Sequence, residues 1–149
     1  MNRRKFIRHS CVACVSGTAL AIFSSSCISN RYIQGELKKD GLEIDAREFE
    51  ITNAGKKTYR PYIIVRNDAL QFPVCVYRFA GNEYSAVWMQ CTHQGTELQV
   101  AGDRLQCSAH GSEFDNKGTV KSGPAQRNLR NFPVTVINDQ SIFIDLRAI

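Results

Sequence analysis

Two pairs of cysteine and histidine, on two short segments, are the residues of this chain best suited to chemistry. One residue separates Cys91 from His93, and two residues separate Cys107 from His110. Thirteen residues lie between His93 and Cys107. Thiolate and neutral imidazole bind soft and borderline metals, so four such side chains on two loops could close one metal centre. The chain has three histidines, and the third, His9, lies near the N-terminus.

This spacing resembles the Rieske motif C-x-H-x(n)-C-x-x-H, in which Gly and Ser follow the second histidine, as Gly111 and Ser112 do here. The family holds a two-iron, two-sulfide cluster asymmetrically, with two cysteines on one iron and two histidines on the other. The ligands that the resemblance implies are Cys91 and Cys107 for the first iron and His93 and His110 for the second.

The resemblance continues beyond these four positions. Residues 118–125 read Gly-Thr-Val-Lys-Ser-Gly-Pro-Ala and are similar to the family's proline loop, which covers the cluster. Gly123 and Pro124 lie in this loop, where a rigid backbone excludes water without supplying a ligand. Ser112 stands where the family has a serine that donates a hydrogen bond to a bridging sulfide.

Four positions depart from the quinol-oxidising, cytochrome bc-type members of the family. Those members carry one further cysteine in each cluster loop, joined as a disulfide; Thr96 and Ala109 stand there in this chain, so we expect packing to hold the loops. Gln94 replaces a leucine at the quinol-docking tip. Phe114 replaces a tyrosine that donates to a cysteine sulfur, and a lost donor lowers the reduction potential. The resemblance therefore implies a potential below that of the quinol-oxidising members.

The asymmetric ligand set determines what such a cluster is for. Neutral imidazoles in place of thiolates make the cluster less negative, and Rieske centres lie at about −150 to +300 mV against about −400 mV for plant-type ferredoxins. The second nitrogen of an imidazole can carry a proton, so electron uptake can be coupled to proton uptake at His93 or His110. In the family geometry these imidazoles reach the surface and give the electron its exit.

These features predict a one-electron carrier with one [2Fe-2S] cluster and no complete active site of its own. The expected partner is a redox protein, either a cytochrome or a periplasmic oxidoreductase. The alternative is the iron–sulfur subunit of a quinol–cytochrome c reductase of the bc type, with quinol as its partner. A chain of 149 residues is too short for the catalytic subunit of a ring-hydroxylating oxygenase.

A second alternative belongs to another class. Two cysteines and two histidines also suit structural zinc, which would make the chain an exported, zinc-stabilised binding module. Zinc modules usually carry close C-x(2–4)-C knuckles, which this chain lacks, and the Gly-Pro-Ala loop has no role in a knuckle.

Residues 1–30 are predicted to be an export signal. Arg3 and Arg4, followed by Lys5 and Phe6, resemble a twin-arginine signal, and the apolar run over residues 11–23 is shorter than the roughly 17–25 residues of a membrane span. An uncleaved short anchor is the alternative. Cys27 follows three serines and is a candidate for lipidation, although Ser24 stands where a lipobox has leucine. We therefore expect an exported protein on the periplasmic side, tethered to the membrane.

The net charge gives no reason to expect nucleic acid as a partner. The chain carries +5, but four of its basic residues lie in residues 1–30, which hold no acidic residue, so the remainder carries +1. Cys75 lies within an apolar run and is predicted to be a buried, unreactive thiol.

The rest of the chain predicts an all-β fold. Residues 31–41 are polar and suggest a linker, and residues 42–149 suggest the Rieske domain. Apolar and polar residues alternate over 42–52, β-rich runs follow at 62–65, 74–79 and 84–89, and hairpins are expected around residues 101–103 and 138–141. An antiparallel sandwich or barrel with a two-loop cluster-binding subdomain at about 90–125 fits this pattern.

Overall fold

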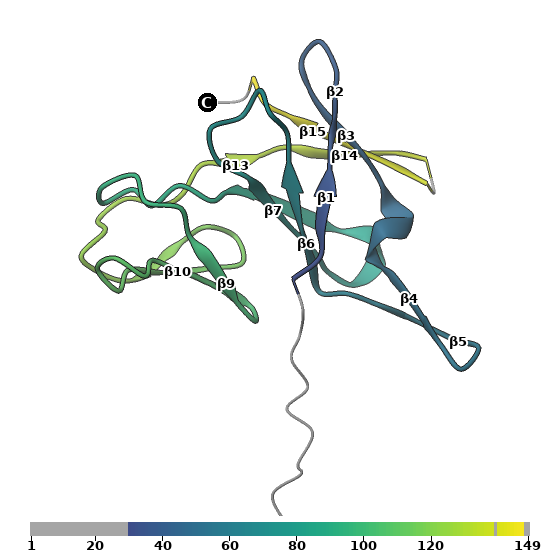
Figure 1. The fold of residues 1–149 in the computed structure, drawn as a ribbon, viewed down its shortest axis with the longest axis horizontal. Helices are drawn as coiled ribbons and strands as arrows, with labels where there is room; N and C mark the ends of the chain where they lie inside the picture. The colour runs from purple at the N-terminus through teal and green to yellow at the C-terminus, as the bar shows by residue number, and fades with distance from the viewer. Residues whose placement is uncertain (1–29, 139, 148–149) are drawn as a thin grey trace, which may run out of the picture.

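The fold is built from β-strands throughout the described part of the chain. A computed structural model describes residues 30–138 and 140–147, which form three sheets and one projecting hairpin (Figure 1). The predicted export signal and Cys27 lie outside the described residues. The all-β prediction is confirmed, because the only helices within the described ranges are two short 3-10 turns. Neither of these turns is long and apolar enough to cross a membrane.

The central sheet has five strands, and its three inner strands are buried on both faces. Its strands, in sheet order, are β1 (Tyr32–Gln34), β6 (Tyr62–Arg66), β7 (Val74–Arg78), β8 (Tyr84–Trp88) and β13 (Asn131–Phe132). In β6, Ile63 and Val65 belong to one core. The alternate residues Tyr62 and Ile64 belong to the other core. Burial on both faces explains why β6 and β7 have continuous apolar runs in the sequence rather than alternating ones.

A second sheet covers one face of the central sheet. Its order is β14 (Val134–Asn138), β15 (Ser141–Asp145), β3 (Gly41–Asp45) and β2 (Glu36–Leu37). Ile142 and Ile144 of β15 stand opposite Ile44 and Leu42 of β3, and all four side chains are buried. This sheet therefore presents an apolar face, which packs against the central sheet as in a β-sandwich.

A third sheet covers the opposite face of the central sheet and carries the predicted cluster loops. Its order is β12 (Val120–Ser122), β11 (Glu113–Asp115), β10 (Arg104–Gln106) and β9 (Gln99–Ala101). The hairpin predicted around residues 101–103 is confirmed by the antiparallel pairing of β9 with β10. Leu105 and Phe114 of this sheet share a core with Cys75 and Val87 of the central sheet. Cys75 is fully buried, as predicted, and burial raises the pKa of its thiol.

The structure differs from the sequence-based prediction at two places. Residues 31–41, predicted to be a linker, contain β1 and β2, and β1 pairs in parallel with β6. Edge strands as short as these have mostly exposed side chains, so their composition resembles that of a linker. The alternating run over 42–52 is interrupted by a 3-10 turn, η1 (Ala46–Phe49), which Asp45 caps through the backbone N–H of Arg47.

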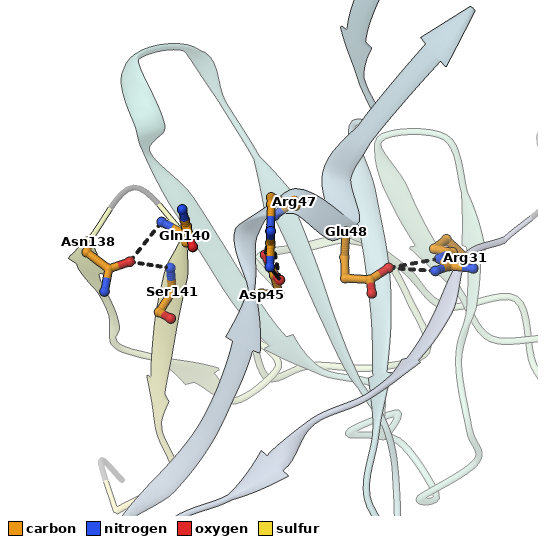
Figure 2. A network of polar contacts seen from close by, with 7 residues as sticks. All are labelled: Arg31, Asp45, Arg47, Glu48, Asn138, Gln140 and Ser141. Atoms are coloured by element: carbon orange, nitrogen blue, oxygen red, sulfur yellow. Dashed lines mark hydrogen bonds and ion pairs between the residues drawn. The ribbon is translucent and has the colours of Figure 1, made fainter.

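Strands β4 (Glu50–Asn53) and β5 (Lys56–Tyr59) form a hairpin that pairs with no other strand among the described residues. Figure 1 shows it projecting at the lower right, away from the third sheet. Ala54 and Gly55 form its two-residue turn with positive φ angles of 48° and 77°. Figure 2 shows that Arg31, near the first described residue, forms an ion pair with Glu48 just before the hairpin.

Gly41 lies where the second sheet has no room for a side chain. A Cβ atom at Gly41 would stand 2.0 Å from the backbone oxygen of Ile144. We expect Gly41→Ala to push β3 away from β15 and to lower the free energy of unfolding by roughly 1–3 kcal/mol, measured by urea denaturation. Gly123→Ala is the control, because a Cβ there meets nothing closer than 3.9 Å and the φ angle of Gly123 is not positive. An equal loss in the two variants would contradict the strand pairing.

Candidate metal centre

The two predicted ligand loops have the same backbone hydrogen bonds. In the first, the backbone N–H of Cys91 donates to the oxygen of Thr96, and the N–H of Gly95 donates to the oxygen of Cys91. In the second, residues 107–112 repeat both bonds, at 2.9 Å each. Each loop is thus a six-residue turn that starts at a cysteine and has a glycine at its fifth position.

The glycines at the fifth position are required by the backbone. Gly95 and Gly111 have φ angles of 75° and 76°, a conformation that side chains other than glycine rarely adopt. Paired residues close both turns at their bases, because Gln90 bridges to Glu97 and Gln106 pairs with Glu113. The sequences Cys-x-His-x-Gly and Cys-x-x-His-Gly therefore describe one turn with its histidine at two different positions.

Both loop cysteines lie inside the protein. The side chains of Cys91 and Cys107 belong to residues that are only 2% and 3% exposed, and neither forms a disulfide. Burial by itself raises the pKa of the Cys107 thiol. Hydrogen bonds from the backbone N–H groups of His110 and Ala109 lower this pKa by more than burial raises it, so the thiol has a pKa below its usual value. Side chains of Cys91 and Thr96 also hydrogen-bond to Cys107 and act in the same direction. The two sulfurs are thus close together, and this position favours a thiolate.

The two loop histidines lie beside each other at the outer end of the loops. Their ring centroids are 4.9 Å apart, and the ring planes are nearly perpendicular at 88°. His110 is exposed and His93 is half-buried. The Nδ1 atom of His93 is buried without a hydrogen-bond partner. A buried nitrogen without a partner costs free energy, so its position suits a bond that the protein alone does not supply.

These four side chains fit a cluster with two metal atoms better than a single ion. The structure separates them into a buried sulfur pair and an outer imidazole pair. Within residues 30–138 and 140–147, no three His, Cys, Asp or Glu side chains gather closely enough to hold one metal ion. A tetrahedral zinc site would need four ligands around one point.

A segment between β12 and β13 ties the two loops together. The hydroxyl of Thr92, beside His93, donates to the backbone oxygen of Arg127 at 2.6 Å. The hydroxyl oxygen of Ser112 accepts from the backbone N–H of Ala125 at 3.0 Å. This segment holds the Gly123–Pro124 peptide, which is cis, and both of these residues are exposed. One stretch of chain thus contacts both loops.

The same segment follows β12 directly, and hydrogen bonds hold its far end beside β12. The backbone N–H of Leu129 donates to the oxygen of Gly118, and the side chain of Asn128 accepts from the N–H of Val120. Asp115 accepts from the N–H groups of Lys117 and Thr119, which shapes the turn between β11 and β12. We call residues 123–130 the strap, because they contact both ligand loops and are anchored beside β12.

The structure brings together most of the residues that the sequence singled out. Ser112 and Phe114 are fully buried beside the loops, and Phe114 shares a core with both loop cysteines. Thr96 and Ala109 lie in the loops without a disulfide, as their identities require. Sequence reasoning missed Thr92 and Asp115, whose side chains act through backbone groups. The sequence features that could have identified them are a threonine between two candidate ligands and an aspartate at the start of a turn, because such side chains often hydrogen-bond to nearby backbone groups.

Comparison with known proteins decides the family. The sequence profile of the Rieske [2Fe-2S] domain matches residues 50–133, which is more than half of the chain. The chain belongs to the Rieske [2Fe-2S] family. It is a Rieske iron–sulfur electron-transfer protein, and the domain binds one [2Fe-2S] cluster. The zinc-stabilised binding module, considered from the sequence, is therefore wrong.

The related proteins include iron–sulfur subunits of cytochrome complexes and a plasma membrane Rieske protein. The cytochrome b6-f complex iron-sulfur subunit 2 of Trichormus variabilis is 27% identical over 157 residues, covering 93% of this chain and 82% of that protein. The ubiquinol-cytochrome c reductase iron-sulfur subunit of Rickettsia felis is 44% identical over 57 residues, or 36% of this chain and 32% of that protein. The solved plasma membrane Rieske protein PetC3 of Synechocystis PCC 6803 has a TM-score of 0.50 at 26% identity, covering 57% of this chain and 86% of that one.

A cavity of about 530 Å³ lies away from this centre, between β1, β3 and the turn before β15. Its lining includes the ion pairs of Arg31 with Glu48 and of Arg47 with Asp45, which Figure 2 shows. It contains no cysteine or histidine. The electron-transfer chemistry therefore belongs to the loops and not to this cavity.

The hydroxyl of Ser112 should stabilise the contact between the second loop and the strap. In Ser112→Ala the buried N–H of Ala125 loses its acceptor, which costs about 1–3 kcal/mol. We expect faster cluster loss on heating, followed by visible absorbance, together with a lower midpoint potential because a donor near sulfur is removed. Ser108→Ala, in the same loop but exposed, should change neither quantity.

Phe114 offers a direct test of hydrogen bonding to the cluster sulfurs. Phe114→Tyr should raise the midpoint potential by an amount on the order of tens of mV, because the new hydroxyl can donate to a cysteine sulfur. The measurement is a redox titration followed by EPR. Phe132→Tyr, in the other core, is the control and should leave the potential unchanged. No rise in Phe114→Tyr would mean that the ring does not face Cys91 or Cys107.

Proposed function

We propose that the four loop side chains are the cluster ligands, with Cys91 and Cys107 on one iron and His93 and His110 on the other. One observation carries this assignment: the loops hold two sulfurs in the core and two imidazoles at the outer end, and Nδ1 of His93 has no partner. The family's asymmetric ligation requires this division into an inner sulfur pair and an outer nitrogen pair.

The protein residues have separate roles in this proposal. The cluster supplies a site that accepts or releases one electron. The backbone N–H groups of Ala109 and His110 favour a negative charge on the Cys107 sulfur. Ser112 and the strap, which are hydrogen-bonded to each other, keep water away from the cysteine side of the cluster. His110 is exposed, so its ring edge brings the redox centre to the surface. The outer nitrogens of the imidazoles can carry a proton when the electron arrives.

The partner we propose is a redox protein outside the cytoplasm, either a cytochrome or a periplasmic oxidoreductase. Gln94, the exposed residue after His93, puts an amide at the tip where quinol-oxidising members have leucine. A polar tip suits a hydrated protein surface better than a lipid-embedded quinol site. Similarity to a cytochrome b6-f subunit over 93% of this chain favours the second candidate, an iron–sulfur subunit of a quinol-oxidising complex.

We further propose that residues 1–30 direct export and tether the protein to the membrane. The paired arginines, the short apolar run and Cys27 support a twin-arginine signal with lipidation or a retained anchor. The relatives named for membrane complexes support attachment to a membrane. In this proposal residues 42–149 are the electron-transfer domain, with its cluster-binding part at about 90–125, held on the periplasmic side.

Replacing one histidine tests the ligand assignment. His110→Cys should move the centre toward ligation by thiolates and lower its midpoint potential toward the roughly −400 mV of all-cysteine clusters. The measurement is a redox titration of the reduced EPR signal, with two irons per chain as the check that a cluster is present. Gln126→Cys, an exposed residue of the strap, is the control for an added thiol. An unchanged potential in a fully loaded His110→Cys protein would refute the assignment.

A quinol-site inhibitor separates the two candidate functions. In native membranes, an inhibitor of the stigmatellin type shifts the cluster's EPR signal only when the imidazole tip docks at a quinol site. We expect no shift, because Gln94 does not provide the apolar tip of quinol-oxidising members. A shift would establish the quinol-oxidising subunit and overturn the carrier.

A further inference from the structure

The β4–β5 hairpin lacks a packing partner that would account for its stability. All four residues of β5 are exposed, and β4 is at most half-buried. The hairpin pairs with no third strand in the described part of the chain. A two-stranded ribbon without further packing is only marginally stable in water, and the half-buried residues of this hairpin are Glu50 and Ile51 of β4. Contact with an additional surface outside the described chain would stabilise this hairpin.

The second strand of the hairpin, β5, carries basic and aromatic side chains. Lys56 and Lys57 are exposed, and the ring of Tyr59 is 45% exposed. The guanidinium of Arg78 lies 3.9 Å from the Tyr59 ring centroid, and the ammonium of Lys57 lies 5.8 Å from it. Glu50 pairs with Lys57, which leaves Lys56 and Arg78 without a carboxylate partner among the described residues. The ribbon therefore presents net positive charge around an exposed phenol.

The hairpin also lies where the described chain begins. Asn30 accepts a hydrogen bond from the hydroxyl of Tyr62, three residues after β5. Arg31 pairs with Glu48, two residues before β4 (Figure 2). Both contacts hold the start of the described chain against the base of the hairpin. In Figure 1 the hairpin lies at the lower right, and β9 and β10 of the cluster-bearing sheet lie at the left, at about the height of the start of β1.

We infer that the β4–β5 hairpin rests on the anionic headgroups of the membrane to which the chain is tethered. Cationic side chains are attracted to anionic lipids, and tyrosine favours the headgroup region, so Lys56, Lys57 and Tyr59 have the chemistry of a surface contact. The 29 residues before Asn30 include the apolar run of the proposed tether, which brings the hairpin to a bilayer. The inference rests on that tether.

This contact would orient the protein. With the hairpin against the headgroups, the cluster-bearing sheet, which Figure 1 shows on the other side of β1 from the hairpin, would not be the surface that touches the bilayer. An electron would then pass to a partner outside the membrane rather than to a quinol within it. In this orientation the tip at Gln94 would contact a hydrated partner, for which a polar side chain is appropriate.

The test uses the full-length protein with its cluster and vesicles of two compositions. One is phosphatidylcholine alone, and the other contains about 30% phosphatidylglycerol. Sedimentation with the vesicles reports the tether, and hydrogen–deuterium exchange of residues 50–60 reports the hairpin. We expect sedimentation with both compositions, and exchange in the hairpin slowed roughly tenfold only with phosphatidylglycerol.

A matched pair of lysine variants gives the control. Lys56→Gln with Lys57→Gln should abolish the slowing, whereas Lys38→Gln with Lys39→Gln should retain it. Lys38 and Lys39 form a second exposed lysine pair in the turn after β2, at the top of Figure 1. Both variants remove two charges, so only position distinguishes them.

The possible outcomes distinguish a failure of the hairpin–membrane contact from a failure of the membrane tether. Sedimentation with both compositions and no slowing overturns the hairpin contact, leaves the tether standing and makes an acidic protein the remaining occupant. Equal slowing on both compositions also overturns it, because charge would then have no role. Sedimentation only with phosphatidylglycerol, reversed by high salt, refutes the tether and overturns the inference that rests on it. No sedimentation with either composition refutes both.

Discussion

The requirement to keep two sulfurs in the core and two imidazoles at the surface governs the rest of this structure. One six-residue turn, used twice, meets it: the first residue points inward, and a glycine at positive φ closes the turn. The cysteines therefore need an apolar core beneath them, which Leu98, Leu105 and Phe114 provide. That core in turn needs a central sheet whose inner strands are buried on both faces, which explains its continuous apolar strands.

The strap shows how weak interactions can hold loops that lack a disulfide. Thr92 and Ser112, one from each loop, form hydrogen bonds to the strap's backbone. Each bond contributes only about 0.5–1.5 kcal/mol, but the strap is itself anchored to the third sheet by Asn128 and Leu129. The two loops thus share one neighbour, which is hydrogen-bonded to both of them.

The two ends of the molecule have different chemistry. The cluster end is made of small and polar residues around two imidazoles, and its cysteines are shielded. The end where the described chain begins carries a basic, aromatic ribbon tied to that beginning through Glu48 and Tyr62. The ligand loops and the β4–β5 hairpin thus belong to different sheets of the fold.

The sequence by itself determined the family, the ligand candidates and the all-β class, because these depend on local signals: Cys and His spacing, glycines in turns and apolar runs. It also indicated that Thr96 and Ala109 could form no disulfide. Only the tertiary structure decided that residues 31–41 contain strands, that residues 46–49 form a 3-10 turn, and that Thr92 and Asp115 shape the site. These outcomes depend on backbone groups distant in sequence, and a backbone hydrogen bond leaves almost no trace in side-chain composition.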